Sequence, residues 1–300
     1  MPRKARHSIA DPASDKVFYI LNTIIMVFIL LITIYPIWFV IIASVSDYHA
    51  VGRGDVFFLP VKFYIDAYVK LMQRPSILIG YRNTLFYTIA GTAINLLLTL
   101  TGGYALSIKF PGNRLISLMV TFTMFFGGGI VPTYFIYKNI GILNTIWVML
   151  LPGAISAWNL ILCRTFISQN IPYELYEAAA IDGCDRIKYY LKIVLPLSTV
   201  LVSMMTLFYA VGHWNSYFNA MMYLDKAKLY PLQLFAREIL VENAVPDTDY
   251  VDLEALEHSQ QIREQLKYAL IVVASLPILA LYPFLQKYFV KGIMVGSVKG

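Results

Sequence analysis

Six long apolar runs alternate with shorter polar segments along the chain. About 20 consecutive apolar residues span the hydrocarbon core of a bilayer, so each run is long enough to cross it with some tilt. The segment 24–34 is apolar on every face except at Thr33, unlike the apolar/polar alternation of a membrane β-barrel. The pattern predicts an all-α polytopic membrane protein with six transmembrane helices, at about residues 17–45, 83–108, 115–138, 142–167, 193–223 and 267–291.

The spacing of these runs also predicts how the chain is organised. Residues 1–16 would form a tail, and residues 17–82 the first transmembrane helix with an outer loop. Residues 83–291 would form a core of five helices, which contains an inner loop at 168–192 and an outer loop at 224–266, and residues 292–300 a second tail. The second outer loop fits a solvated connection and a partner-binding surface equally well, and its acidic residues are Asp247, Asp249, Asp252, Glu254, Glu257 and Glu264.

Composition supports a membrane protein and narrows its partners. The chain is 58% hydrophobic and 14% charged, whereas soluble domains are usually about 25% charged. The net charge is +6, but the basic residues are scattered singly and do not form the stripe that a nucleic-acid backbone needs, so no nucleic-acid partner is expected. The two cysteines, Cys163 and Cys184, do not resemble a metal site in spacing or neighbours.

The distribution of charge predicts the orientation in the membrane. Lys and Arg resist translocation, so short loops that contain them stay in the cytoplasm. Helices that alternate from a cytoplasmic N-terminus place about 13 basic and 6 acidic residues inside, against about 11 and 12 outside. The asymmetry predicts that both termini are cytoplasmic. The inner basic residues include Arg3, Lys4, Arg6, Lys16, Lys109, Arg114, Arg164, Arg186, Lys188, Lys192, Lys287, Lys291 and Lys299.

The inner loop at 168–192 carries the most informative pattern. Asn170 can cap a helix, Pro172 suits its first turn, and Glu174 complements the helix dipole. Gly183 can end this helix in the left-handed conformation, before a second short helix. The alanines at 178–180 leave one side of the first helix without bulk, so another protein could approach it closely. By composition alone, a stable connector is the more common role of such a loop.

The spacing of this loop resembles the EAA loop of ABC-importer permeases. The matching residues are Glu177-Ala178-Ala179, then Gly183, and Leu195-Pro196. Cys184 replaces the usual Ala and Tyr190 a common Phe, both in the same volume class. From about residue 15 to the C-terminus the chain resembles the carbohydrate-uptake branch, especially permeases for oligosaccharides and polysaccharide fragments in Gram-positive bacteria. Further matches are Asn83-Thr84, Pro132-Thr133-Tyr134, the run from Gly141 to Thr145, Leu151-Pro152 and Trp214-Asn215.

This resemblance implies a type I ABC-importer permease fold in a bacterial cytoplasmic membrane, in contact with lipid. It implies a heterodimer with a second permease, two cytoplasmic ATPase subunits, an extracytoplasmic sugar-binding protein or lipoprotein, and a carbohydrate substrate. ATP and Mg²⁺ would bind the ATPase, because the chain has no G-x-x-x-x-G-K-[ST] phosphate loop. The chain itself would bind no cofactor or metal and catalyse no reaction. The coupling residues implied are Glu174, Glu177, Ala178, Ala179, Asp182 and Gly183.

Polar residues within the runs suggest a sugar path. Aromatic rings can cover the apolar faces of a sugar ring while amides pair with its hydroxyl groups. Trp and Tyr also populate membrane interfaces, so each residue has a competing structural role. His213 lacks a second ligand nearby and is expected to be a hydrogen-bonded packing residue. The path candidates are Tyr134, Tyr137, Trp158, Asn159, Trp214, Asn215, Tyr217 and Asn219.

Two other functional classes fit the sequence less well. A stand-alone secondary carrier usually has internal repeats and carboxylates at membrane depth that bind the coupling ion, and the chain has neither pattern. An integral membrane enzyme needs clustered His, Asp or Glu residues, or a Ser/Lys pair, which the runs also lack. The glycine triplet at 127–129 predicts a break in the third helix, for close packing or for lining a path.

Overall fold

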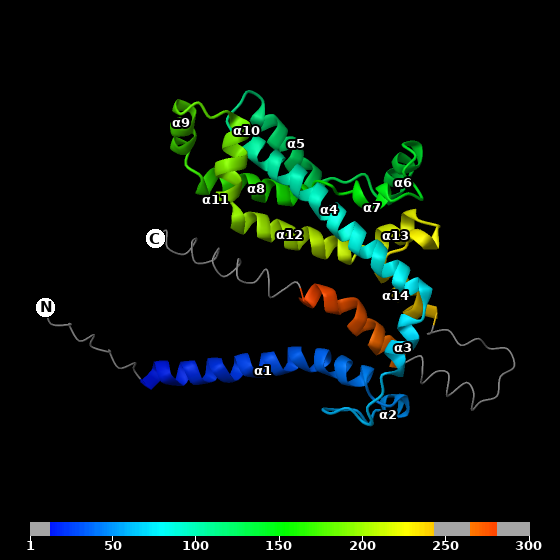
Figure 1. Cartoon of the computed structure of the whole chain (residues 1–300). Helices are drawn as coiled ribbons and strands as arrows, with labels where there is room; N and C mark the ends of the chain where they lie inside the picture. Colours follow the sequence, from blue (N-terminus) through cyan, green and yellow to red (C-terminus); the bar gives the residue numbers. More distant parts are fainter. Residues whose placement is uncertain (1–12, 243–264, 281–300) are drawn as a thin grey trace. The chain divides into compact units, whose positions relative to one another are not determined.

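The computed structural model describes residues 13–242 and 265–280, which are helical with irregular connections and contain no β-strand (Figure 1). These residues belong to two compact units: 13–69 with 265–272, and 70–242 with 273–280. The all-α fold class is therefore confirmed for the described chain. The predicted tail at 1–16 lies outside the described residues up to residue 12, and its residues 13–16 belong to the first helix. The second tail, the acidic residues 247–264 and the end of the sixth apolar run also lie outside the described residues.

The first unit is built around α1, Ala13–Ser44, which carries exposed apolar side chains along most of its length. This helix matches the first predicted run. The chain then turns into α2, Tyr48–Arg53, where Asp47 caps the first turn through the N–H of His49. Gln265 donates to the carbonyl of Ser46 at 2.7 Å, so the segment after α1 is tied to residues far along the chain. A short helix, α3 (Asp66–Met72), follows.

The second unit is organised around α4, Pro75–Ser107, against which α8 and α12 pack. Glycines on α4 allow this close approach. A Cβ atom at Gly103 would lie 2.3 Å from the Sγ atom of Cys163 on α8, and one at Gly91 would lie 2.3 Å from the Nε2 atom of His213 on α12. The bounds of the two partners are Ala157–Asn170 for α8 and Thr199–Trp214 for α12.

The third predicted helix is broken at the glycine triplet, as expected. It consists of α5, Asn113–Phe125, and α6, Ile130–Asn139, which are bent by 116° relative to each other. The prediction that the fourth run, 142–167, forms one continuous helix is wrong. Only α7, Trp147–Leu150, and α8 are helical, because Pro152 has no N–H to donate and Gly153 takes a φ of +71° between them.

The fifth predicted run is also divided. The segment that ends at Leu197 is bent by 81° from α12, and α12 ends at Trp214 before α13 begins. The leading segment contains α10 (Arg186–Tyr189), the π-helical η1 (Tyr190–Val194) and α11 (Leu195–Leu197). The following elements are α13 (Tyr217–Tyr223), η2 (Ala227–Leu229) and α14 (Leu232–Glu242).

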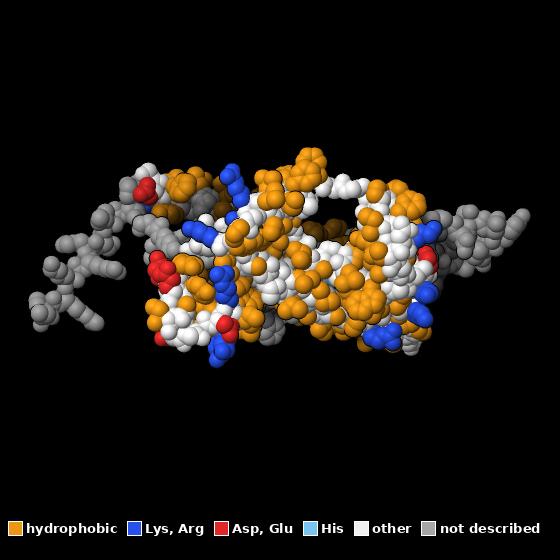
Figure 2. Space-filling model, turned by 90° about the horizontal axis from the view of Figure 1, so that it is seen from above, with side chains coloured by type: hydrophobic (Ala, Val, Ile, Leu, Met, Phe, Trp, Pro, Cys, Tyr) orange, Lys and Arg blue, Asp and Glu red, His pale blue; other side chains and the backbone are white. Residues whose placement is uncertain are grey.

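Two described helices, Ser14–Ser44 and Pro75–Ser107, are long and apolar enough to cross a membrane, and up to four spans result if each bent pair counts as one. The six-helix count therefore stays a prediction. On the face shown in Figure 2, charged side chains gather toward the two ends, and hydrophobic and uncharged side chains fill the middle. In the second unit, Lys109 and Arg114 follow the C-terminal end of α4, whereas Arg82 and Lys228 lie near its N-terminal end.

Candidate functional site

The predicted coupling helix is α9, Glu174–Ile181. Its N-terminus differs from the sequence prediction, because Asn170 does not cap it. Asn170 belongs instead to the last turn of α8, where its side-chain amide donates to the carbonyl of Phe166 at 2.9 Å. The helix starts after Tyr173, and Glu174 and Glu177 both lie in its first turn, where negative charge complements the helix dipole.

The C-terminus of α9 is a Schellman motif. The N–H of Cys184 donates to the carbonyl of Ala179 at 2.9 Å, and the N–H of Gly183 donates to the carbonyl of Ala180 at 3.0 Å. Gly183 has a φ of +76°, the left-handed conformation in which a Cβ atom is unfavourable. Asp182 is the C-cap residue and is exposed. The structure thus confirms that the helix ends at a left-handed Gly183.

The two faces of α9 have different environments. Residues Glu174, Glu177, Ala178 and Ile181 have the i, i+3, i+4, i+7 spacing of one helical face, and all four are exposed, Ile181 to 87%. Ala179 lies on the opposite side, 8% exposed, in the cluster that contains Tyr189 and Tyr190. The expectation that Ala179 itself faces a partner protein does not match this geometry, since its side chain packs within the chain.

The loop is anchored to the helices by aromatic rings. Tyr190 stacks on Tyr104 of α4 with ring centroids 4.9 Å apart, and Tyr189 meets the edge of Tyr176 of α9 at 5.3 Å. The hydroxyl of Tyr104 donates to the carbonyl of Arg186 at 3.3 Å. Movement of α9 and α10 would therefore be transmitted to α4. In the sequence, the signal for this anchor is the recurrence of tyrosines at 173, 176, 189 and 190 in and beside the two short helices.

The second short helix is present as predicted, and it starts after Asp185, a cap that the sequence analysis did not identify. Its side chain accepts a hydrogen bond from the N–H of Lys188 at 2.8 Å, and the same two residues form an ion pair at 3.6 Å. The backbone hydrogen bond lowers the pKa of Asp185 below its ordinary value, with the charge of Lys188 contributing further. In the helix–glycine–helix loop, a Schellman motif thus ends α9 and an N-cap begins α10, with Gly183 and Cys184 between the two caps.

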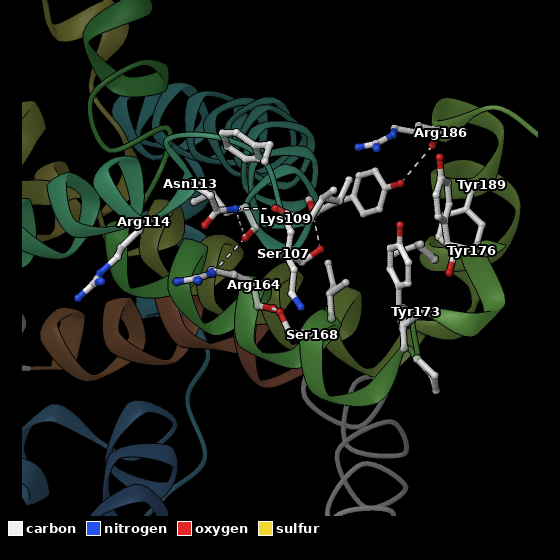
Figure 3. Close-up of a pocket in the computed structure, with 18 residues that line it drawn as sticks. Ser107, Lys109, Asn113, Arg114, Arg164, Ser168, Tyr173, Tyr176, Arg186 and Tyr189 are labelled. Carbon is white, nitrogen blue, oxygen red and sulfur yellow. Dashed lines mark hydrogen bonds between the residues drawn. The ribbon is translucent and has the colours of Figure 1, made fainter. Parts of the chain in front are cut away.

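A pocket of about 800 Å³ lies between this loop and the C-terminal end of α4. Figure 3 shows Lys109, Arg114 and Arg164 on one side of the pocket, and Arg186 with tyrosines of the coupling loop on the other. Arg164 of α8 reaches α4, where its Nε–H donates to the carbonyl of Leu106 at 3.1 Å. The sequence analysis used these basic residues only for orientation and did not predict that they meet.

The residues predicted to line the sugar path lie on different elements and differ in exposure. Tyr134 and Tyr137 of α6 converge on Tyr223 of α13, with ring centroids 6.4 Å and 5.1 Å apart. Tyr217 and Asn219, also on α13, are exposed. At the start of α8, Trp158 is exposed and Asn159 is buried, so these neighbours point to different environments.

Trp214 and Asn215 also differ, although they are adjacent. Trp214 is 2% exposed, and its indole N–H donates to the carbonyl of Ala274 at 2.9 Å. Asn215 is exposed at the end of α12, and its amide donates back to the carbonyl of Val211 at 3.0 Å. Trp214 therefore has the contacts of a packing residue, whereas Asn215 keeps its amide oxygen available for a ligand.

His213 is a hydrogen-bonded packing residue, as expected. Its Nε2 atom lies 2.6 Å from the Oδ1 atom of Asn95 on α4. The amide of Asn95 in turn donates to the carbonyls of Gly153 and Ala154, at 3.1 Å and 2.8 Å. This network joins α4, α12 and the break between α7 and α8, and it satisfies the carbonyls that the break leaves without helical partners.

These features define a class of protein. In the second unit, α8 and α12 pack on the long apolar helix α4, other apolar helices are bent at breaks, and a helix–glycine–helix loop presents an exposed helical face. Broken helices are tolerated at membrane depth where they are buried or line a cavity. The arrangement is typical of a membrane transport subunit, and the exposed face of α9 is its candidate surface for a partner.

Comparison with known proteins identifies the family, although no family model matches the chain. The chain is 37% identical to protein LplC of Bacillus subtilis over 295 residues, 98% of this chain and 99% of that protein. It is 38% identical to YtcP of Bacillus subtilis, a polygalacturonan/rhamnogalacturonan transport system permease protein, over 271 residues, 90% of this chain and 94% of YtcP. The chain belongs to the ABC-importer permeases of the carbohydrate-uptake branch.

A solved structure agrees with this assignment. The crystal structure of a bacterial ABC transporter involved in the import of the acidic polysaccharide alginate contains a chain that superimposes with a TM-score of 0.83. The two chains are 31% identical, and the match covers 93% of this chain and 99% of that chain. The described all-helical fold is therefore that of an ABC-importer permease.

Proposed function

We propose that this chain is the permease subunit through which an ATP-driven importer carries a short acidic oligosaccharide across the bacterial cytoplasmic membrane. The observation that carries the proposal is similarity over nearly the whole chain to a polygalacturonan/rhamnogalacturonan permease and to a component of an alginate importer. Both of those proteins are named for polymers that contain uronic acids. The path would then accept a sugar that bears carboxylates.

The N-terminal end of α4 supports an anionic substrate. Arg82, Lys138, Lys226 and Lys228 are exposed there or on the elements that pack beside it. Positive charge at the mouth of a path raises the local concentration of an anionic ligand. The converging tyrosines 134, 137 and 223 offer flat apolar surfaces for sugar rings, and exposed Asn215 and Asn219 offer amides for hydroxyl groups.

The coupling loop would transmit the force for transport. A separate ATPase, which binds ATP and Mg²⁺, would receive the exposed face of α9 that carries Glu174, Glu177, Ala178 and Ile181. Closure of two such ATPase subunits would move α9, and the stacked tyrosines would pass this movement to α4. The bent helices would then rock between inward-open and outward-open states. Ala179 would hold α9 on the permease, and Gly183 would set the turn between the two short helices.

The proposed assembly contains further subunits. A second permease would complete the path, since one set of helices does not enclose an oligosaccharide, and an extracytoplasmic sugar-binding protein would deliver the substrate. Purification of the tagged chain from its own cells should recover a second permease and an ATPase. Recovery of the chain as a lone, transport-competent protein would instead support the secondary carrier.

Transport in reconstituted vesicles tests the substrate class. With the complete importer and its binding protein, we expect ATP-dependent uptake of a short galacturonate oligomer. A neutral arabinose or maltose oligomer of the same length is the matched control, and we expect at most slight uptake of it. Preferential uptake of the neutral oligomer would contradict the acidic substrate while leaving the permease assignment intact.

A further inference from the structure

The pocket beside the coupling loop carries an unexplained concentration of positive charge. Lys109 follows α4, Arg114 lies in the first turn of α5, and Arg164 lies on α8, so three elements supply one cation each (Figure 3). None of these three side chains is within ion-pair distance of a carboxylate among the residues described. Lys109 and Arg114 are exposed and Arg164 is half-buried, and positive charge gathered at one pocket raises the local concentration of an anionic ligand.

The hydrogen bonds of the pocket fix Arg164 and the turn that precedes α5. The Nε–H of Arg164 donates to the carbonyl of Leu106, which fixes the side chain, and its two terminal nitrogens make no hydrogen bond to the part of the chain that the structure describes. Asn113 donates to the carbonyls of Leu106 and Ile108, at 3.0 Å and 2.6 Å, so the turn that carries Lys109 is held in place. The guanidinium fork of arginine matches the geometry of a phosphate group.

The position of the pocket favours a phospholipid over a soluble anion. Lys109 and Arg114 stand where α4 ends and α5 begins, and Arg164 of α8 bonds to this end of α4. The charge asymmetry assigns this end of the apolar helices to the cytoplasmic side. Beyond Arg114, α5 exposes Leu115, Leu118 and Phe122, by 58%, 64% and 56%. A lipid whose phosphate binds the cations would lay its acyl chains along this apolar surface. Basic pockets between helices on the cytoplasmic side are typical sites for anionic head groups.

The ATPase is a less suitable occupant of the same pocket. The exposed face of α9 is acidic, through Glu174 and Glu177, and carries Ile181, and it is the face that the proposed function assigns to the ATPase. The basic side of the pocket belongs to α4, α5 and α8 instead. Arg186, on the loop side, stacks over the ring of Tyr176 at 5.5 Å and so connects the pocket wall to α9.

We propose that Lys109, Arg114 and Arg164 form a binding site for the head group of an anionic phospholipid of the cytoplasmic leaflet, beside the coupling loop. This inference concerns the lipid and does not depend on which sugar is transported. Because one wall of the site is the coupling loop, a bound lipid would stiffen the connection between α4 and α9. ATPase activity coupled to transport would then increase with the anionic lipid content of the membrane.

Native mass spectrometry of the purified importer tests binding. Phosphatidylglycerol should bind with higher affinity than phosphatidylcholine, and Lys109→Gln and Arg114→Gln should each lower that affinity about fivefold, the effect of one lost cation near a membrane surface. Lys192→Gln is the matched control, because it removes one exposed inner-face cation outside the pocket. Equal binding of the two lipids, or an equal loss in Lys192→Gln, would overturn the site.

Two further measurements separate the possible occupants. Glycerol 1-phosphate at millimolar concentration should not displace the lipid, and displacement would assign the pocket to a soluble phosphate compound. The permease pair without its ATPase should bind phosphatidylglycerol as the complete importer does. Binding that is lost when the ATPase is present would assign the pocket to the ATPase interface. If a Gln variant no longer co-purifies with the second permease, Arg114→Lys takes its place in the test. Arg114→Lys keeps the positive charge, and it should restore the binding of phosphatidylglycerol.

Discussion

Gly183 combines a φ of +76° with open space around its Cα atom, since an added Cβ atom would meet nothing within 4 Å. A substitution there is therefore penalised by backbone conformation alone. Gly183→Val should cost about 1–2 kcal/mol locally and shift the loop out of its left-handed turn. We expect sugar-stimulated ATPase activity and uptake to become uncoupled in reconstituted vesicles. Insertion and assembly should be retained, because the residue is exposed.

Two variants make this test specific to the coupling loop. Gly183→Asn should keep most of the coupling, because Asn tolerates the left-handed conformation. Gly54→Val introduces the same kind of strain elsewhere, since Gly54 has a φ of +75° and equal open space at the end of α2. Full coupling in Gly183→Val, or equal loss in Gly54→Val, would show that the turn at Gly183 is not part of the coupling mechanism.

Trp214 and Asn215 should respond to substitution in opposite ways. Trp214→Phe removes the hydrogen bond to Ala274 from a residue that is 2% exposed, which should lower the free energy of unfolding by about 1 kcal/mol. Asn215→Leu should leave the unfolding temperature nearly unchanged and reduce uptake. Thermal unfolding in detergent and vesicle uptake separate the two effects. Normal uptake by Asn215→Leu would remove this residue from the proposed path.

At the scale of the elements, the contact between α4 and α8 depends on one glycine. A Cβ atom at Gly103 would lie 2.3 Å from the Sγ atom of Cys163, which is fully buried. Gly103→Ala should therefore lower the free energy of unfolding by about 1–3 kcal/mol through overpacking. Unfolding of the purified protein in detergent measures the change.

The neighbouring glycine supplies the matched control. A Cβ atom at Gly102 would meet the Cδ1 atom of Leu160 at 2.9 Å, the flexible end of a side chain. Both substitutions gain the same helix propensity of about 1 kcal/mol, so their difference isolates the clash. Combining Gly103→Ala with Cys163→Gly should recover part of the stability. Equal stability of Gly102→Ala and Gly103→Ala would contradict this account of the α4–α8 contact.

The breaks in the helices show where local signals suffice. The glycine triplet at 127–129 has low helix propensity, so the bend between α5 and α6 could be predicted. The break before α8 was missed, although Pro152 and Gly153 are adjacent in the sequence. Apolar character continues through both breaks, and hydropathy alone therefore does not distinguish one helix from two. The network of Asn95 and His213, which accommodates the second break, joins residues far apart in the chain.

At the scale of the whole molecule, the charge asymmetry predicts which end of α4 is cytoplasmic. In a Cys184→Ser background, Lys226→Cys should react with an impermeant thiol reagent added to intact cells, and Ala180→Cys should not. Both positions are exposed, and the remaining native thiol, Cys163, is fully buried. Labelling is measured as a mass shift of the purified chain.

Permeabilised cells provide the control for this labelling. Both introduced cysteines should then react, which would show that Ala180→Cys is accessible once the membrane is open. Labelling of Ala180→Cys in intact cells would place the coupling loop outside and exclude an ATPase partner for it. The domain boundaries and the count of six spans stay predictions. The same labelling experiment tests them when single cysteines are introduced into the other predicted loops.

The sequence by itself determined the properties that depend on local chemistry. Continuous apolar runs require a helical membrane protein, since only helices satisfy the backbone groups of such runs in lipid. Glycine at 183 predicted the end of α9, because few other residues adopt a left-handed turn cheaply. The spacing of residues 177–183 and 195–196 indicated the family, which the whole-chain relatives confirm.

Only the tertiary structure decided which side of an element faces a neighbour. Ala178 and Ala179 look equivalent in the sequence, yet one is exposed and the other is packed against the tyrosines of the loop. Trp214 and Asn215 differ in the same way, since Trp214 is buried and Asn215 is exposed. Lys109, Arg114 and Arg164 come from three elements, and no local pattern relates them. Their meeting depends on how α4, α5 and α8 pack, which is set by contacts between residues distant in the chain.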